Sequence, residues 1–290
     1  MPARSVRYFL KALQSVPFAQ IQEEAHLPFS MAVVGRPEER QDALRFLFPD
    51  ARDLCVLPAR SLVQEFRSIA PGQAPGFDII VVATADSPEL LPAPNAYHLA
   101  HLGHWPRLFE RILQDRPDLA ASCARRFPGL RPMVSKEIIT QTARTNAQFA
   151  FTTSLPQLMP FAEIFVPATA LADVFIITRN QAEMLLRLAA IYDLPTTPTA
   201  RIQDAAPLVG NAVGWRALSR MATSLIPGGI GVVANALFAY AGTVTVGRAL
   251  EIYYRTGIRP DAAAIKQLFR TALGEARWFV TQNPLSRRRR

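Results

Sequence analysis

The chain has 290 residues, of which 50% are hydrophobic and 19% charged, so it can bury a large core and is not an intrinsically disordered protein. Two cysteines, Cys55 and Cys123, are too few for a disulfide framework or a multi-cysteine zinc site. The net charge of +9 lies entirely in the second part, because residues 1–130 carry 14 basic and 14 acidic side chains and residues 131–290 carry 18 and 9. This basic half is also apolar and lacks the mixed aromatic and basic surface typical of RNA-binding modules. The charge therefore favours contact with a membrane surface over nucleic acid.

The first third of the chain predicts a helical arm and a small α/β domain. Hydrophobic residues recur at helical spacing over residues 4–16, so we expect an amphipathic arm within residues 1–27. Three short apolar runs then predict strands at 31–35, 53–57 and 77–83, separated by helical patterns at 38–48 and 59–69. Alternating strands and helices predict a small parallel βαβαβ unit over residues 28–100.

The rest of the chain, residues 101–290, is predicted to be all-α with a basic tail, Arg287 to Arg290. A proline-rich loop is expected at 84–97, and no convincing strand follows it. Helical patterns occupy 105–114, 117–126, 132–155, 172–193, 205–225, 230–256 and 261–279. The predicted fold class is therefore α+β and mostly α, a small parallel unit followed by an apolar helical bundle with two helical hairpins.

Both hairpins are apolar and interrupted by proline, one at Pro156 and one at Pro227-Gly228-Gly229. The second adjoins 27 uncharged residues, 221–247, with Arg216 and Arg220 before them and Arg248 after them. A spanning helix needs about 20 apolar residues, so the 18 residues 230–247 are marginal. Two interpretations stay open: a soluble bundle with apolar helices, or membrane contact by re-entrant or interfacial hairpins. Small residues at four-residue spacing would let another backbone approach closely: Ala239, Thr243 and Gly247.

The first strand leads through Gly35 into a helix, the context of a phosphate-binding loop. In such loops a second glycine, a lysine and a serine or threonine contact the phosphates and magnesium. Aligned from Gly35, the last three positions hold Arg40, Gln41 and Asp42, so the groups that would bind nucleotide are missing. We expect a degenerate loop and no cofactor.

Three histidines at three-residue spacing, His98, His101 and His104, would lie along one ridge of a helix and could bind a transition metal. Gly103 argues against a regular helix there, so a solvated loop is the alternative. Farther on, Glu183 and Arg187 form an i,i+4 pair that predicts a solvated or bundle-bridging helix face. The sequence contains no G-x-S-x-G or H-E-x-x-H motif, and we expect no enzyme activity.

Residues 132–270 resemble the YcjF-type family, a bacterial domain of unknown function found alone, beside or fused to Era-like GTPases. The residues that carry the resemblance are 142–149, Ala172-Asp173, 178–181, 188–192, Gly214-Trp215-Arg216, 226–229, 239–243, Gly247-Arg248-Ala249, Tyr253-Tyr254 and Gly257. The resemblance implies a helical domain associated with the inner membrane or with a GTPase partner, and no known catalysis.

The leading hypothesis is a non-enzymatic, membrane-associated helical protein on the cytoplasmic side of the bacterial inner membrane. Its contact residues would lie around Pro156 and Pro227, and its partner would be the bilayer or a membrane protein. The first 24 residues lack the apolar core of a secretory signal. The alternatives are a cytoplasmic GTPase-partner or pseudo-nucleotide-binding module and, third, a metal-dependent enzyme that uses the histidine cluster. Self-association is compatible with all three.

Overall fold

The computed structural model describes residues 14–50, 63–68, 76–84, 93–154, 166–197, 200–201 and 232–282. The chain divides into two compact units. The α/β unit comprises Ala19–Val134 and Ala190–Asp193, and the helical unit comprises Met1–Phe18, Ser135–Ala189 and Leu194–Arg290. The predicted domain boundary near residue 100 differs from this division, because the short helices up to Val134 group with the sheet.

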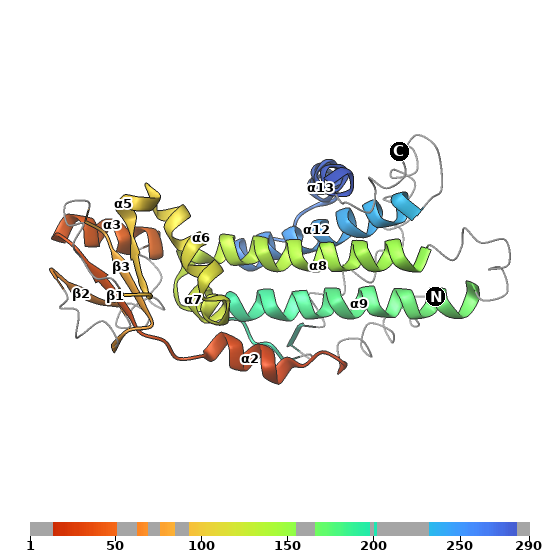
Figure 1. Cartoon of the computed structure of the whole chain (residues 1–290). Helices are drawn as coiled ribbons and strands as arrows, with labels where there is room; N and C mark the ends of the chain where they lie inside the picture. The colour runs from red at the N-terminus through yellow and green to blue at the C-terminus, as the bar shows by residue number, and fades with distance from the viewer. Residues whose placement is uncertain are drawn as a thin grey trace. The chain divides into compact units, whose positions relative to one another are not determined.

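A four-stranded parallel sheet forms the centre of the α/β unit (Figure 1). Its strands are β1 (Met31–Val34), β2 (Val63–Phe66), β3 (Ile79–Val82) and β4 (Ala96–His98), in the order β2-β1-β3-β4. Every residue of β1 and β3 is buried, which explains their uninterrupted apolar sequences, since a strand covered on both faces has no polar side. The predicted α+β class with a small parallel sheet is confirmed.

The described helices of this part of the chain are short: α2 (Phe18–His26), α3 (Pro37–Leu47), α5 (Leu99–Leu102), α6 (Trp105–Asp115) and α7 (Ala120–Arg126). Their core is aromatic, since Phe127 lies edge-on to Phe29 and Phe48, each at 5.6 Å between ring centroids. Gly129 follows in a short 3-10 turn, and a Cβ on it would lie 1.8 Å from the carbonyl oxygen of Phe46. Only glycine fits at this close backbone contact.

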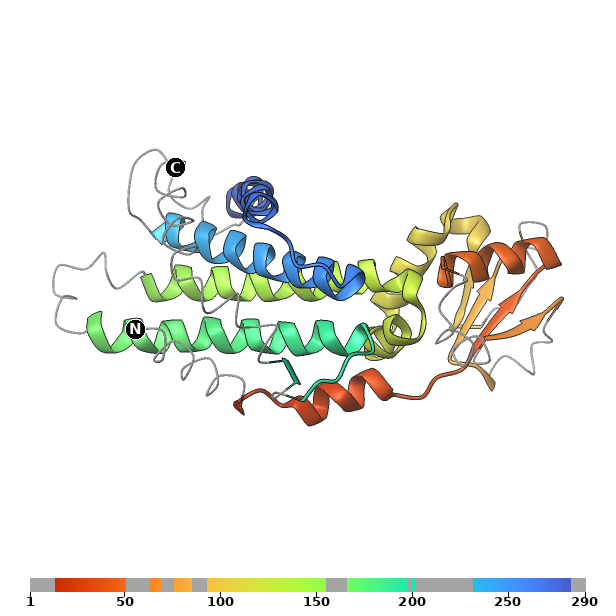
Figure 2. The same cartoon turned by 180° about the vertical axis from the view of Figure 1, so that it is seen from behind.

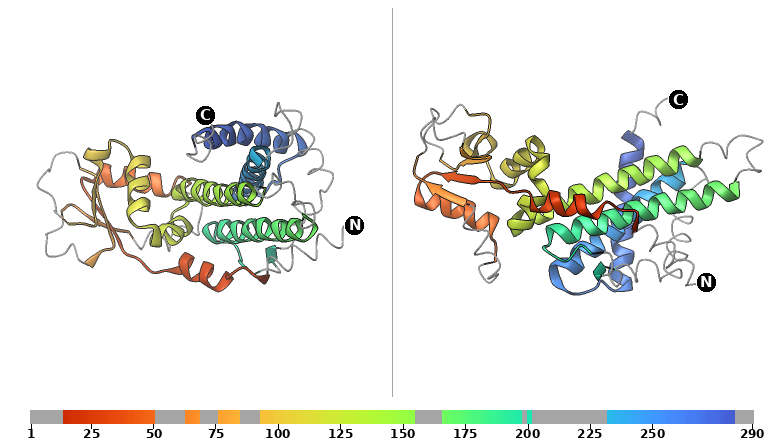
Figure 3. Two further views of the ribbon diagram at one scale, coloured as in Figure 1. Left: turned by 45° about the vertical axis from the view of Figure 1, so that its right-hand side comes forward. Right: turned by 90° about the horizontal axis from the view of Figure 1, so that it is seen from below.

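The helical unit contains α8 (Arg131–Ser154), α9 (Val166–Ile191), α12 (Val232–Thr256) and α13 (Ala262–Gln282). Figures 1 and 2 show α8 and α9 side by side, with α12 along α8, and Figure 3 shows α13 running across α12. Gly247 of α12 packs on Ile139 of α8, where an added Cβ would lie 2.6 Å from Ile139 Cγ1. A small residue at this position therefore lets the two helices approach closely.

The strands at 31–35 and 77–83 and the helices at 105–114, 117–126, 132–155, 230–256 and 261–279 are confirmed to within a few residues, and α9 begins six residues before the predicted position 172. The helix predicted at 59–69 is wrong, because Val63–Phe66 pairs with β1 as strand β2. β4 was not expected, since only Tyr97 of its three residues is buried and the sequence shows no apolar run. The predicted loop at 84–97 therefore overlaps this strand, in which Ala96 pairs with Ile80.

Other predictions fall outside the described residues: most of the arm at 4–16, the strand at 53–57, the helix at 205–225 and the basic tail. The same holds for much of the predicted hairpin contact, namely Pro156, Arg216, Arg220, Pro227, Gly228 and Gly229. Within the part of the chain that the structure describes, no helix combines the length and apolarity needed to cross a bilayer.

Candidate functional site

The loop after β1 is closed by a carboxylate of the protein itself. Glu39, in the first turn of α3, accepts a hydrogen bond at 2.8 Å from the backbone N–H of Arg36 and ion-pairs with the Arg36 guanidinium at 2.8 Å. A Cβ on Gly35 would lie 3.0 Å from Glu39 Oε2, so this carboxylate sits directly over the glycine. The N–H that could contact a phosphate at the helix N-terminus is thus already bound to an internal anion.

The three residues that replace the nucleotide-binding groups are also engaged elsewhere or exposed. Arg40 donates to the carbonyl oxygen of Gly35 at 3.0 Å and to Glu65 at 3.2 Å. Gln41 and Asp42 are exposed, and Asp42 pairs with Arg45 at 3.1 Å. The loop is built as a strand-to-helix connection, and its geometry offers phosphate no cluster of donors.

The three histidines do not lie on one helix. His98 ends strand β4, His101 lies in the single-turn helix α5, and His104 caps α6 by accepting the N–H of Arg107 at 3.3 Å. Gly103, at φ 80°, ends α5 and separates the last histidine from the first two. Among the described residues, these three included, no group of three or more His, Cys, Asp or Glu side chains is placed to hold a metal ion. The predicted metal cluster is therefore corrected. Cys123 is buried, and burial raises the pKa of its thiol.

Two of the three small-residue positions of α12 contact α8, since Thr243 accepts from Asn146 and Gly247 packs on Ile139. Thr243 and Gly247 are buried, and Ala239 is half-buried and accepts the Thr243 hydroxyl proton on its carbonyl oxygen at 2.8 Å. Arg248, expected at a membrane flank, pairs with Glu275 of α13 at 2.9 Å. These contacts lie within the helical unit, and the interpretation of the four residues as membrane or partner contacts stays a prediction.

A polar network joins three helices inside the helical unit. Asn146 of α8 is fully buried, donates to Thr243 of α12 at 3.0 Å, and accepts from Asn180 of α9 at 2.8 Å. Gln181 lies 3.5 Å from the same threonine oxygen. Because each buried polar group has a partner, the network fixes the register of the three helices at little energetic cost.

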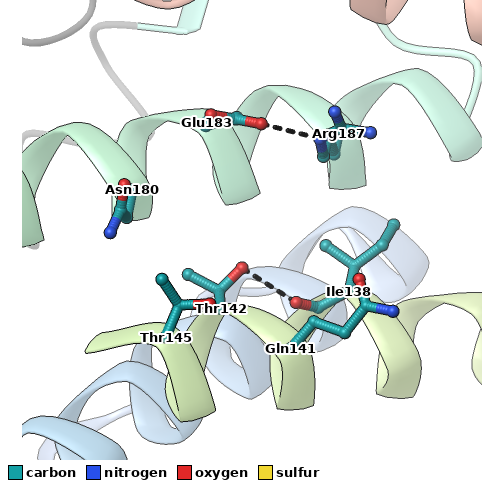
Figure 4. Close-up of a pocket in the computed structure, with 7 residues that line it drawn as sticks. All are labelled: Ile138, Gln141, Thr142, Thr145, Asn180, Glu183 and Arg187. Atoms are coloured by element: carbon teal, nitrogen blue, oxygen red, sulfur yellow. Dashed lines mark hydrogen bonds and ion pairs between the residues drawn. The ribbon is translucent and has the colours of Figure 1, made fainter. Parts of the chain in front are cut away.

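This network borders a pocket of about 300 Å³ between α8 and α9 (Figure 4). Four residues from one face of α8 line it: Ile138, Gln141, Thr142 and Thr145. Asn180, Glu183 and Arg187 line it from α9. Gln141 and Thr145 are exposed and the other five lining residues are half-buried, so the pocket is a polar groove that is open to solvent.

Opposite charges lie next to each other in this pocket. Arg187 Nε donates to Glu183 Oε1 at 3.1 Å, and Arg179 Nη1 lies 4.0 Å from Glu183 Oε2. The i,i+4 pair predicted from the sequence is confirmed, and its partly exposed side chains line the half-open pocket. Thr142 donates its hydroxyl proton to the carbonyl oxygen of Ile138 at 2.9 Å, which leaves its oxygen as an acceptor.

A second feature is the last turn of α12 and the connection to α13, residues 253–260. Its Ile258 is 71% exposed, the highest value among the large hydrophobic side chains that the structure describes. Gly257, at φ 72°, ends α12, and the Thr256 hydroxyl accepts the N–H of Ile258 at 3.1 Å. Arg255 and Arg259 are exposed on either side, and the Arg259 guanidinium lies 5.1 Å from the Tyr253 ring centre.

Sequence analysis did not single out this turn or the pocket. The signal for the turn was an isoleucine between two arginines directly after a helix-ending glycine. The pocket had a weaker signal, polar residues at 141, 142 and 145 repeating at helical spacing on a helix expected to be apolar. Which helix face meets which neighbour is a property of the tertiary fold and is not contained in that spacing.

The chain matches no protein-family model, no curated protein and no solved structure. The resemblance to the YcjF-type family accordingly stays a prediction from the residues quoted above.

Proposed function

We propose that this chain is a non-enzymatic helical protein that docks reversibly on an anionic bilayer surface, such as the cytoplasmic face of the bacterial inner membrane. The observation that carries the proposal is the exposed Ile258 between Arg255 and Arg259 at the turn from α12 to α13. An apolar side chain flanked by cations and tyrosines is the chemistry of an interfacial contact. The contact assigned from sequence to the proline hairpins therefore moves, in this proposal, to residues 253–260.

The geometry of the turn supports insertion of a single side chain. The hydrogen bond between Thr256 and Ile258 and the contact between Arg259 and Tyr253 hold the turn in one conformation, so little ordering is needed on binding. Tyrosine rings suit the boundary between headgroups and acyl chains, since they combine an apolar body with a polar hydroxyl. Arg255 and Arg259 would contact lipid phosphates on both sides of Ile258.

Approximate energies predict weak binding. Full burial of one isoleucine side chain contributes about 1.5–3 kcal/mol, and each arginine near an anionic surface about 1 kcal/mol. Together these give about 4 kcal/mol, which corresponds to a dissociation constant near 1 mM in accessible lipid. At this affinity only part of the protein is bound to the membrane. Added salt should release it, because the two arginines supply much of the binding free energy.

Sedimentation of the full chain with vesicles tests the proposal. At accessible lipid of about 1 mM or more, part of the wild-type protein should pellet with vesicles of 30% phosphatidylglycerol in phosphatidylcholine (a composition of roughly physiological anionic charge), and all of it should remain in the supernatant at high salt. Ile258→Asp should abolish pelleting. The matched control is Val233→Asp, which changes a 46% exposed hydrophobic residue at the start of the same helix and should pellet as wild type does.

Two results would contradict the proposal. One is wild-type protein that stays in the supernatant at low salt with anionic vesicles. The other is equal loss of binding in both variants, which would mean that general surface hydrophobicity, and not the turn, determines pelleting.

A further inference from the structure

The outer side of α13 carries a row of exposed residues that the proposed membrane contact leaves unexplained. Figure 3 shows α13 on the outside of the helical unit, across α12. Lys266, Arg270 and Gly274 are exposed and follow one another at four-residue spacing. Residues four apart on a helix form one ridge. We call these three residues the α13 ridge.

Contacts on the buried side of α13 hold this ridge in place. Phe269 lies edge-on to Phe238 of α12, at 5.9 Å between ring centroids. Arg248 of α12 donates to both carboxylate oxygens of Glu275, at 2.9 and 3.0 Å. The ridge is therefore a fixed surface, and a partner that binds it does not have to order the helix first.

Two properties of the ridge lower the stability of α13. Gly274 is a poor helix former in the interior of the helix, and an added Cβ would meet nothing within 4 Å, so no close contact in the described structure requires a glycine there. Lys266 and Arg270 are like charges four residues apart, and such pairs repel each other. A partner that approaches closely and brings negative charge would account for both properties.

The acidic residues described in α12, α13 and their connection do not supply that charge. Asp261 accepts the backbone N–H of Ala264 at the start of α13, Glu275 pairs with Arg248, and Glu251 is half-buried on α12. Within the ranges that the structure describes, no carboxylate forms an ion pair with either cation of the ridge. The two cations are therefore available to carboxylates of another molecule.

The residues beside the ridge favour a protein helix over a bilayer as the partner. A helix that lies on a membrane carries large apolar residues between its cations. The exposed neighbours of the ridge are instead Ala263, Gln267 and Thr271. A glycine among small residues lets a second helix set its own ridge into the adjoining groove.

We propose that the α13 ridge docks an acidic α-helix of a partner protein, with carboxylates at Lys266 and Arg270 and a small residue over Gly274. The contact is weak and sensitive to salt, because exposed ion pairs are screened. It does not depend on the bilayer contact at Ile258, so either proposal can fail without the other.

Fluorescence anisotropy on the full chain tests the docking in the absence of lipid. The probe is a labelled helical peptide of about 20 residues, built from Glu-Ala-Ala-Ala repeats, and it should bind at low salt. The same peptide with glutamine in place of glutamate should bind about tenfold more weakly, because two exposed ion pairs are lost. A peptide with lysine in place of glutamate should not bind.

Variants connect binding to the ridge. Gly274→Leu leaves the charge unchanged and should weaken binding of the glutamate peptide at least about tenfold, because the new side chain keeps the helices apart. The matched control is Gln148→Leu, at an exposed position on α8, which should bind as wild type does. Lys266→Glu combined with Arg270→Glu should abolish binding of the glutamate peptide and create binding of the lysine peptide.

Four results would overturn the proposal. The glutamate peptide fails to bind at millimolar concentration, or Gly274→Leu and Gln148→Leu bind it equally well. A DNA duplex binds the wild-type chain more tightly than the peptide and is lost in Gly274→Leu, which would assign the ridge to nucleic acid. Lys266→Gln combined with Arg270→Gln, which should pellet with anionic vesicles as wild type does, stays in the supernatant, which would assign the ridge to the bilayer.

Discussion

The two units arrange the polar groups of their candidate sites in opposite ways. In the α/β unit, β1 lies between β2 and β3, which is where parallel sheets of this type commonly bind ligands beyond the strand ends. That position is occupied by Glu39, whose carboxylate satisfies the Arg36 N–H and guanidinium from within the chain. In the helical unit the polar groups of Glu183, Arg187 and Asn180 line an open pocket. The loop after β1, where parallel sheets often bind ligands, is therefore filled by a side chain of the protein itself. The pocket between α8 and α9, at a place that rarely binds ligands, is open.

The largest expected effect concerns packing in the α/β unit. Gly129→Ala should lower the free energy of unfolding by about 3 kcal/mol or more, because its Cβ would lie 1.8 Å from a backbone oxygen that cannot move aside easily. Urea unfolding measures it. Gly274→Ala on α13, where an added Cβ meets nothing within 4 Å, is the control and should stabilise the protein. Equal effects in the two variants would show that the close contact at Gly129 is absent.

A smaller loss is expected at the α8–α12 contact of the helical unit. Gly247→Ala should lower the free energy of unfolding by about 1–3 kcal/mol, since the atoms in the way belong to the Ile139 side chain and can shift in part. In a double-mutant cycle, Ile139→Ala should relieve much of that loss. Strict additivity of the two changes would contradict direct packing of Gly247 on Ile139.

The next prediction concerns the pKa of Glu39, the carboxylate that closes the loop in the α/β unit. The hydrogen bond and ion pair with Arg36 hold the pKa of Glu39 below its usual value. The stability from this pairing is therefore present above the unfolded pKa of about 4.3 and is lost as the pH falls through the lower folded pKa. Glu39→Gln should lower stability at pH 7 by up to about 1 kcal/mol, as for an exposed pair, and match wild type at the acid end. A loss that is constant across thermal melts from pH 7 to pH 3 would refute this role.

The smallest effect has the opposite sign and lies on α12. Burial raises the pKa of Glu251, although Arg255 and Arg248 act against the shift. A carboxyl with a raised folded pKa favours the folded state only while it is protonated, so its contribution is lost as the pH rises through that pKa. Glu251→Gln should raise the melting temperature slightly at pH 7 and leave it unchanged near pH 3. Destabilisation by this variant at pH 7 would mean that electrostatic attraction to the two arginines outweighs the cost of burial.

Sequence patterns predicted the parts of the fold that depend on long, regular periodicity. The helices at α8, α12 and α13 and the fully buried strands β1 and β3 follow directly from runs of apolar residues. The edge strands β2 and β4 could not be predicted in this way, because Val63–Phe66 and Ala96–His98 are short and half-exposed. They become strands only through pairing with β1 and β3.

The candidate sites show the same limit. The degenerate loop was foreseen from the absence of lysine and serine, yet its closure by Glu39 depends on a side-chain contact that spacing does not specify. Thr243 and Gly247 suggested close helix packing, and their partners Asn146 and Ile139 lie about a hundred residues away in the sequence. Ile258 is exposed because Gly257 ends α12 and begins a turn. A glycine in the sequence indicates such a turn but does not establish it.

The central claim, that the α12–α13 turn enters a bilayer, is tested most directly by placing a fluorophore at its tip. Ile258→Trp should show a blue-shifted emission on anionic vesicles and strong quenching by lipids brominated near the top of the acyl chain, relative to the wild-type spectrum. Lys266→Trp, at an exposed position on α13, serves as the control and should show neither change. Emission from Ile258→Trp that is unaltered by vesicles and by brominated lipid would contradict the account.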